Sequence, residues 1–234
     1  MTCIFIANLG RELILAVDKR VSYISEDGKK HPVGDNEEKI TRTAAGIVTG
    51  CGAVALLQPV KDYLKQKSFK NTDEVLELIK TTRANHSREN ANSSRLKSEL
   101  AETCWILTYP TYCDGKPITR AIYFHPSSSL DNFVVLPEGR VLCIPSGLTP
   151  EQAQHLQKEL QEQTDNCLSQ LPYEIAKQEI IKLMLNLMSD VAGQSNTVSK
   201  TCDIALIDSD EVFISLEQSK DNTNPEFSPL PYPA

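Results

Sequence analysis

The sequence contains no run of apolar residues long enough to cross a membrane, and no segment with the pattern of a signal peptide. It also lacks an excess of positive charge, because 24 basic and 31 acidic residues give a formal net charge of -7. This balance argues against a nucleic-acid partner. We therefore expect a cytoplasmic protein that binds neither a membrane nor a nucleic acid.

Patterns of metal ligands and disulfides are missing as well. The seven cysteines are an odd number and are scattered without a C-x-x-C pair, which indicates reduced thiols in a protein core. The four histidines are equally dispersed, so their spacing predicts neither a zinc site nor a Cys/His dyad. We expect no metal and no cofactor.

A threonine stands directly behind the initiator methionine and opens the apolar run TCIFIAN, residues 2–8, which predicts a strand. Methionine is normally removed when the second residue is small. Removal of Met1 would leave Thr2 with a nucleophilic hydroxyl and a free α-amine, and such an amine, whose pKa in short peptides is about 7.7 to 8.0, can act as its base. Because threonine also favours strands, this position alone does not establish catalysis.

A second apolar run, residues 12–18, follows after a short loop around Gly10 and predicts a hairpin. A three-residue loop would place Thr2 opposite Asp18. A two-residue loop would shift the register by one residue and place Lys19 there instead. Both strands are apolar on both faces, so the sheet is expected to be covered on two sides.

Asp18 at the end of a buried strand needs a partner, because an unpaired carboxylate in a low dielectric is costly. The nearest cations in the sequence are Lys19, Arg20 and Lys39. Lys39 opens a further predicted strand, and the strand GIVTG then leads through Gly50 into a helix.

These features, in this order, resemble the N-terminal half of proteasome β-type subunits, which belong to the N-terminal nucleophile hydrolases. The residues that carry the resemblance are Thr2, the triplet Asp18-Lys19-Arg20, Lys39 with Ile40, and Gly50. The resemblance implies that Thr2 is the nucleophile, with Asp18 and Lys39 as the ion pair around it. It also implies that the Gly50 N–H holds the oxyanion.

Each implied role has a physical reason. A charged Lys39 held by Asp18 would lower the pKa of the Thr2 amine, and a preorganised backbone N–H contributes a few kcal/mol to acyl transfer. In the structural alternative, Asp18 and Lys39 are a plain buried ion pair and Gly50 is a turn glycine.

The resemblance extends to the second half of the chain. Ser146, just before a predicted helix, and Asp190, at the end of a buried one, resemble the serine and aspartate that lie behind the nucleophile and its amine in the family. There the aspartate is followed two residues later by Ser-Gly, whereas this chain reads VAGQS. Either Gly193 fills the serine position or a local shift lets Ser195 do so.

The resemblance also implies a small and mostly apolar first substrate pocket. The residues that would line it are Val21, Thr41, Val48 and Gly52. Such a pocket favours a hydrophobic side chain before the scissile bond.

The order of the predicted elements indicates the fold class. Strands are followed by two helices, then by strands, two more helices and two closing strands. This order is expected of an α+β protein with four layers, αββα, in which two antiparallel sheets lie between helices. We expect one domain over residues 1–217. Residues 218–234 are proline-rich and predict a disordered tail, or an extended segment for a partner.

The leading hypothesis is a threonine peptidase or amidase that forms an acyl-ester on Thr2 and works in a homo-oligomeric ring. Its substrate would be a peptide or amide, and an ATP-dependent unfoldase as partner is left open. The alternative is a non-catalytic ring or assembly subunit, which would not need Thr2, Asp18 and Lys39 together but which the missing serine at Gly193 keeps open. A third hypothesis, dinucleotide binding by the pattern GCGAVA, lacks the parallel strand with an acidic end that such sites require.

Overall fold

The computed structural model describes residues 2–25, 29–222 and 224–233. Within these residues the chain forms five helices and antiparallel sheets, so the expected α+β class is confirmed. The larger sheet has the order β10-β1-β2-β11-β12-β13. Its strands are β1 (Ile4–Asn8), β2 (Leu13–Asp18), β10 (Val141–Ile144), β11 (Cys202–Asp208), β12 (Glu211–Gln218) and β13 (Ser228–Pro229).

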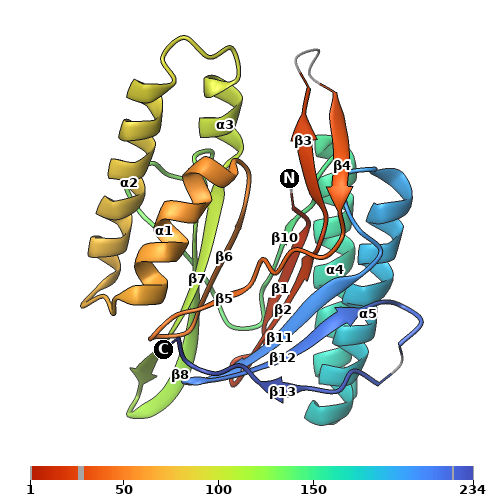
Figure 1. Ribbon diagram of the computed structural model, residues 1–234. Helices are drawn as coiled ribbons and strands as arrows, with labels where there is room; N and C mark the ends of the chain where they lie inside the picture. Colours follow the sequence, from red (N-terminus) through yellow and green to blue (C-terminus); the bar gives the residue numbers. More distant parts are fainter. Residues whose placement is uncertain (1, 26–28, 223, 234) are drawn as a thin grey trace.

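A second sheet has the order β5-β6-β7-β8-β9, and β3 and β4 form a separate hairpin. The bounds in the second sheet are β5 (Thr41–Arg42), β6 (Ile47–Cys51), β7 (Cys104–Cys113), β8 (Lys116–Phe124) and β9 (Val134–Leu136). The hairpin consists of β3 (Val21–Ile24) and β4 (Lys30–Gly34), and Figure 1 shows it projecting from one end of the molecule beside the N-terminus.

Helices cover the outer face of each sheet (Figure 1). On the smaller sheet lie α1 (Val54–Gln66), α2 (Thr72–Glu89) and α3 (Leu96–Glu102); on the larger lie α4 (Pro150–Gln170) and α5 (Tyr173–Gln194). Three apolar clusters correspond to this arrangement: one between the two sheets, one under α1 and α2, and one under α4 and α5. Burial of these faces is the main favourable contribution to folding.

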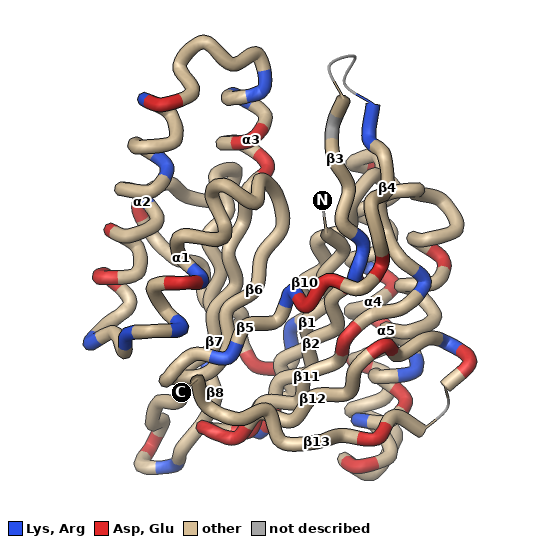
Figure 2. The backbone as a smooth tube through the Cα atoms, viewed as in Figure 1, with Lys and Arg blue, Asp and Glu red and all other residues tan. Residues whose placement is uncertain are grey.

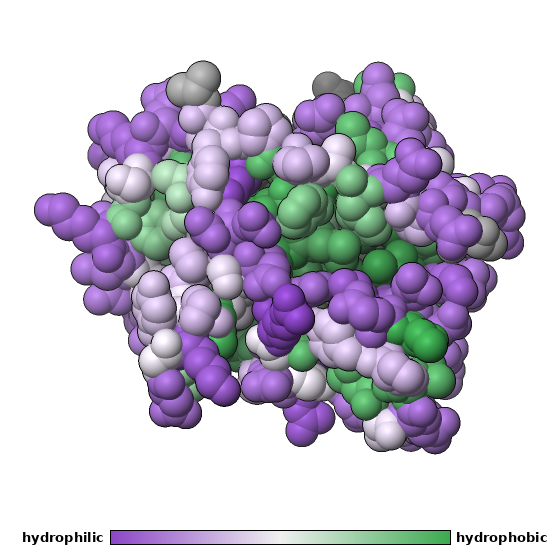
Figure 3. Space-filling view, turned by 90° about the horizontal axis from the view of Figure 1, so that it is seen from below, coloured by the Kyte–Doolittle hydropathy of each residue, from purple (hydrophilic) through white to green (hydrophobic). Residues whose placement is uncertain are grey.

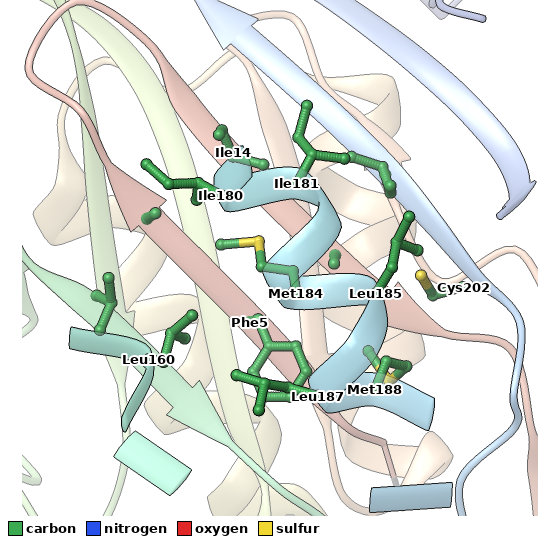
Figure 4. Packing of buried hydrophobic residues seen from close by; sticks show 14 of the residues in the cluster. Phe5, Ile14, Leu160, Ile180, Ile181, Met184, Leu185, Leu187, Met188 and Cys202 are labelled. Atoms are coloured by element: carbon green, nitrogen blue, oxygen red, sulfur yellow. The ribbon is translucent and has the colours of Figure 1, made fainter. Parts of the chain in front are cut away.

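The helix α5 buries one face against β2 and α4, while Glu174, Gln178 and Asp190 are exposed on its other face. Figure 4 shows Phe5 of β1 beside Leu187 of α5, with Met184 on the same side of the helix. The predicted start of α4 is confirmed. The Thr149 side chain accepts a hydrogen bond from the Gln152 N–H, and the Gln152 side chain accepts one from the Thr149 N–H.

The hairpin register differs from the first of the two expectations. The Leu9 N–H donates to the Glu12 carbonyl, so Gly10 and Arg11 form a two-residue loop, with Gly10 at a φ of 86°. Ile4 therefore lies opposite Val17, which places Cys3 opposite Asp18. The expected pairing of Thr2 with Asp18 is wrong, because the shorter loop moves the register by one residue.

The C-terminal segment also differs from the expected disordered tail. Ser228 and Pro229 pair with β12, and the Leu230 N–H donates to the Val212 carbonyl at 2.7 Å. The prolines suggested disorder, but Phe227 and Leu230 pack against the apolar clusters and hold the segment on the sheet. Figure 3 shows the end of the molecule opposite the β3–β4 hairpin, with hydrophobic residues gathered between hydrophilic borders.

Candidate active site

Thr2 lies at the end of the larger sheet, just before β1, and its residue surface is only 6% exposed. The pairing of Ile4 with Ile144, continued by two residues, places Thr2 opposite Ser146. On the other side, the β1–β2 register continued in the same way places Thr2 opposite Lys19. Met1, whose removal the sequence predicts, lies outside the described residues.

A cavity of about 220 Å³ opens beside Thr2. Its lining comes from both sheets and from α3, and includes Thr2, Cys51, Gly52, Glu102, His125 and Ser146. Burial and the nearby Arg83 lower the pKa of His125. The cavity therefore brings Thr2, a strand-to-helix turn and a histidine to one place.

Asp18 is completely buried and accepts four hydrogen bonds. Its Oδ1 accepts from the Cys3 N–H at 2.8 Å and from Lys39 Nζ at 2.9 Å. Its Oδ2 accepts from the N–H groups of Arg20 and Ser199 at 2.9 and 3.3 Å. Because the Cys3 nitrogen belongs to the peptide bond that follows Thr2, Asp18 links Lys39 directly to the chain terminus.

Lys39 is 8% exposed and forms the predicted ion pair with Asp18. Its Nζ also donates to the Arg20 carbonyl at 2.7 Å. Burial lowers the pKa of Lys39, against the opposing attraction of Asp18. A second buried amine lies next to it: Lys61 Nζ donates to the Lys39 carbonyl at 2.8 Å, and burial lowers the pKa of Lys61 to about 8.

The second ion pair near Thr2 was not expected from the sequence. Lys19 is not a partner of Asp18, because its Nζ lies 3.1 Å from the Asp203 carboxylate of β11. The Glu217 N–H also donates to Asp203, whose pKa is raised by burial. The strands β1, β6, β7 and β10 carry no charged residue (Figure 2). The carboxylates of the two buried ion pairs lie at strand ends, with Asp18 at the end of β2 and Asp203 near the start of β11.

Gly50 lies in β6 and does not line the cavity, whereas Gly52 does. The Thr43 N–H donates to the Gly46 carbonyl, and the alternation of an antiparallel ladder then directs the Gly50 N–H to the β5 side of β6. The strand β5 begins at Thr41, which pairs with Val48, so the N–H of Gly50, two residues further along β6, lies beyond the paired region. Of the two glycines, only Gly52 therefore lines the cavity.

Packing requires glycine at both positions. A Cβ at Gly50 would lie 2.3 Å from the Cys104 carbonyl oxygen and 2.7 Å from Leu57 of α1. Gly52 has a φ of 115°, which side chains rarely adopt, and its Cβ would lie 2.5 Å from the Thr103 Cα.

Ser146 belongs to a buried chain of hydroxyl groups. Its Oγ lies 3.0 Å from the Thr197 hydroxyl, which lies 2.7 Å from the Ser195 hydroxyl. Ser195, and not Gly193, is thus the residue placed behind Ser146, since Gly193 is exposed on α5. Thr197 was missed because its role depends on a contact across 51 residues of sequence.

Asp190 is not brought to this site. It is exposed on α5, which continues to Gln194, whereas Ser146, Thr197 and Ser195 are buried. The position that the family resemblance gave to Asp190 is therefore corrected: the helix extends past it and leaves its carboxylate at the surface.

Three of the four expected pocket residues lie away from the cavity. Val48 is fully buried in the cluster under α1 and α2. Val21 and Thr41 are half-buried in β3 and β5. Only Gly52 lines the cavity.

No protein-family model and no curated protein matches the chain. Solved structures do match. Anbu (ancestral beta-subunit) from Yersinia bercovieri has a TM-score of 0.57 at 13% identity, over 100% of this chain and 89% of that chain. An Anbu (Gly-1) mutant from Hyphomicrobium sp. strain MC1 has a TM-score of 0.55 at 14% identity, over 93% and 87% of the two chains.

At these identities the likeness shows the fold alone. It also corrects the family suggested by the sequence: the matching structures are Anbu proteins, a family distinct from the proteasome β-subunits, and no other comparison supports a proteasome β-subunit. The described residues contain no helix with the length and apolar character that a membrane span requires.

Proposed function

We propose that this chain is a threonine-type hydrolase of amide bonds, with Thr2 as nucleophile after removal of Met1. The observation that carries the proposal is the Asp18 carboxylate, which joins the Lys39 ammonium group to the peptide that follows Thr2 through hydrogen bonds of 2.9 and 2.8 Å. A structural ion pair has no need of this position, beside a cavity lined by the terminal hydroxyl.

In the proposed reaction, the Thr2 Oγ attacks the carbonyl carbon of a peptide or amide and its proton passes to the Thr2 amine. The Lys39 charge lowers the pKa of that amine and favours its neutral form. A backbone N–H of Gly50 or Gly52 holds the developing oxyanion. Water then hydrolyses the acyl-ester and releases the second product.

We infer that the layers of helices and sheets are the αββα sandwich of N-terminal nucleophile hydrolases, built as one domain whose larger sheet includes β13 of the C-terminal segment. The three apolar clusters support this, because each fills one interface between layers. The seven free cysteines support a reducing compartment such as the cytoplasm.

A second candidate is a non-catalytic subunit of a homo-oligomer. The exposure of Asp190 favours it, because the carboxylate implied by the family resemblance is absent from the site. The words "ancestral beta-subunit" in the description of the Yersinia bercovieri structure are compatible with an assembly in both candidates.

Covalent labelling tests the proposal. The purified chain, with its intact mass measured to establish loss of Met1, is incubated with a peptide epoxyketone, which requires both the hydroxyl and the amine of an N-terminal threonine. We expect one adduct on Thr2, and none in Thr2→Ala.

The matched control is Thr81→Ala, which removes an exposed threonine from α2 and should label like the wild type. Equal labelling of Thr2→Ala would exclude Thr2 as nucleophile. Retention of Met1 together with absence of an adduct would favour the assembly subunit.

A further inference from the structure

Two cysteines lie directly opposite each other at the edge of the candidate active site. Cys51 ends β6 and pairs with Cys104, which begins β7. Both side chains belong to the apolar cluster between the sheets, so they lie on the same face. Residues opposite each other in antiparallel strands have Cα atoms about 4.5 to 5.5 Å apart. Disulfides join Cα atoms about 4.4 to 6.8 Å apart, so this placement is compatible with a disulfide.

The two thiols are already in contact, and their environments differ. The neighbouring Cys104 thiol lowers the pKa of Cys51, and the same interaction raises the pKa of Cys104 well above its usual range. The Cys51 sulfur also lies 3.7 Å from the Glu102 carbonyl oxygen. Of the pair, Cys51 is therefore the better nucleophile.

Cys51 is also the thiol of the pair that can be reached from the cavity. Cys51 lines the cavity together with Thr2, whereas Cys104 is fully buried behind it. A small oxidant that enters the cavity meets Cys51 first. The other buried thiols, Cys3 and Cys202, lie in the cluster under α4 and α5, and burial raises the pKa of both.

We propose that Cys51 and Cys104 are a redox-active pair that closes into a disulfide when a peroxide enters the cavity. The Cys51 thiolate attacks one peroxide oxygen, the O–O bond breaks, and the leaving hydroxide takes up a proton as water. Cys104 loses its proton and attacks the resulting sulfenic sulfur, and the hydroxide that leaves carries this proton away as a second water. Two thiols are oxidised and one hydrogen peroxide is reduced to two waters.

The disulfide would act on the site through the backbone. Cys51 lies between Gly50 and Gly52, the two candidate oxyanion donors, so a bond to Cys104 changes the position of this turn relative to Thr2. Formation of the disulfide is independent of the proposed function. Only its consequence, slower labelling of Thr2, rests on that proposal.

Peptide mapping tests the bond itself. The full chain carrying Cys113→Ser is treated with hydrogen peroxide under native conditions, remaining thiols are alkylated, and the protein is digested with trypsin without reduction. Cys113 is replaced because it is exposed and shares the tryptic peptide 98–120 with Cys104. We expect peptide 98–120 linked to peptide 43–61, which contains Cys51, and release of both by dithiothreitol.

Cys104→Ser is the diagnostic variant, in which Cys51 should accumulate as a sulfenic acid that dimedone traps. Cys167→Ser, at a half-buried position on α4, is the matched control and should keep the cross-link. Oxidation of Cys167 without any link between Cys51 and Cys104 would overturn the proposal.

Epoxyketone labelling separates the two proposals. If both hold, peroxide slows labelling at least fivefold in the wild type and not in Cys51→Ser. A mapped disulfide in a chain that never labels would leave the redox pair intact and remove the hydrolase.

Discussion

Asp18 shows at the residue scale what local sequence can and cannot predict. The sequence around it indicates the need for a partner and offers three nearby cations, but not the choice among them. Lys39 pairs with Asp18, while Lys19 turns to the opposite face and meets Asp203, 184 residues further along the chain. A partner so distant leaves no mark in the sequence around Lys19, so this second buried pair could not have been predicted.

The hydroxyl chain leads to a residue-scale prediction. Thr197→Val keeps the shape of the side chain but removes the hydroxyl between Ser146 and Ser195. We expect a loss of about 1–3 kcal/mol in the free energy of unfolding, because two buried hydroxyls lose a partner. We also expect epoxyketone labelling to slow about tenfold, through the altered position of Ser146 opposite Thr2.

Asp190→Asn is the contrasting variant in the same labelling assay. Because Asp190 is exposed, we expect the Asp190→Asn variant to be labelled at the same rate as the wild type. A large loss of labelling in Asp190→Asn with full labelling in Thr197→Val would show that the carboxylate, and not the hydroxyl chain, supports Thr2.

At the scale of elements, the apolar pattern predicted the long helices by their buried stripes and the buried strands by their continuous apolar runs. The hairpin of β3 and β4 was not predicted, since its strands project from the sheets and bury little apolar surface. It is held by local contacts such as the stacked rings of Tyr23 and His31, whose centroids are 5.1 Å apart. The apolar pattern also could not predict the length of the turn between β1 and β2, which fixes the register at Thr2.

The close packing of β6 against α1 and β7 gives a prediction at this scale. In Gly50→Ala, the added methyl group would lie 2.3 Å from the Cys104 carbonyl oxygen, a backbone atom that no change of rotamer can move. We expect a loss of about 3 kcal/mol in urea unfolding experiments. Gly193→Ala, with no atom within 4 Å on an exposed part of α5, should instead gain about 1 kcal/mol. Equal stability of the two variants would contradict this packing.

At the scale of the whole molecule, composition and element order were sufficient to predict the α+β class, whereas the sequence motifs did not predict the family. Short matches at Thr2, Asp18, Lys39 and Gly50 pointed to proteasome β-type subunits, but the folds that match the chain are Anbu structures at 13 and 14% identity. Single residues at suitable separations can occur in several families of similar fold, so they do not identify a family.

Global stability should depend on pH through Lys61. Its pKa is about 8 in the folded chain and 10.5 in the unfolded chain, so between these values the unfolded state binds more protons. The wild type should therefore gain stability relative to Lys61→Met as the pH rises from about 8 to about 10.5, by at most about 3 kcal/mol. Urea titrations across this range measure the difference.

Lys65→Met, at an exposed position of the same helix, is the control for the pH series. It should give a curve parallel to that of the wild type. If the stability curve of Lys61→Met also ran parallel to that of the wild type, the Lys61 amine would not be desolvated in the folded chain.

The anchored C-terminal segment decides how the protein can be handled. Tyr232 donates to the Asp210 carbonyl and lies under the Arg42 guanidinium group. Arg42 pairs with the first residue of β6, while the cavity lies past the last residue of that strand. An affinity handle or fluorophore fused after this segment would thus emerge on the side remote from the cavity, whereas the same fusion ahead of Thr2 would occupy the amine that the chemistry needs.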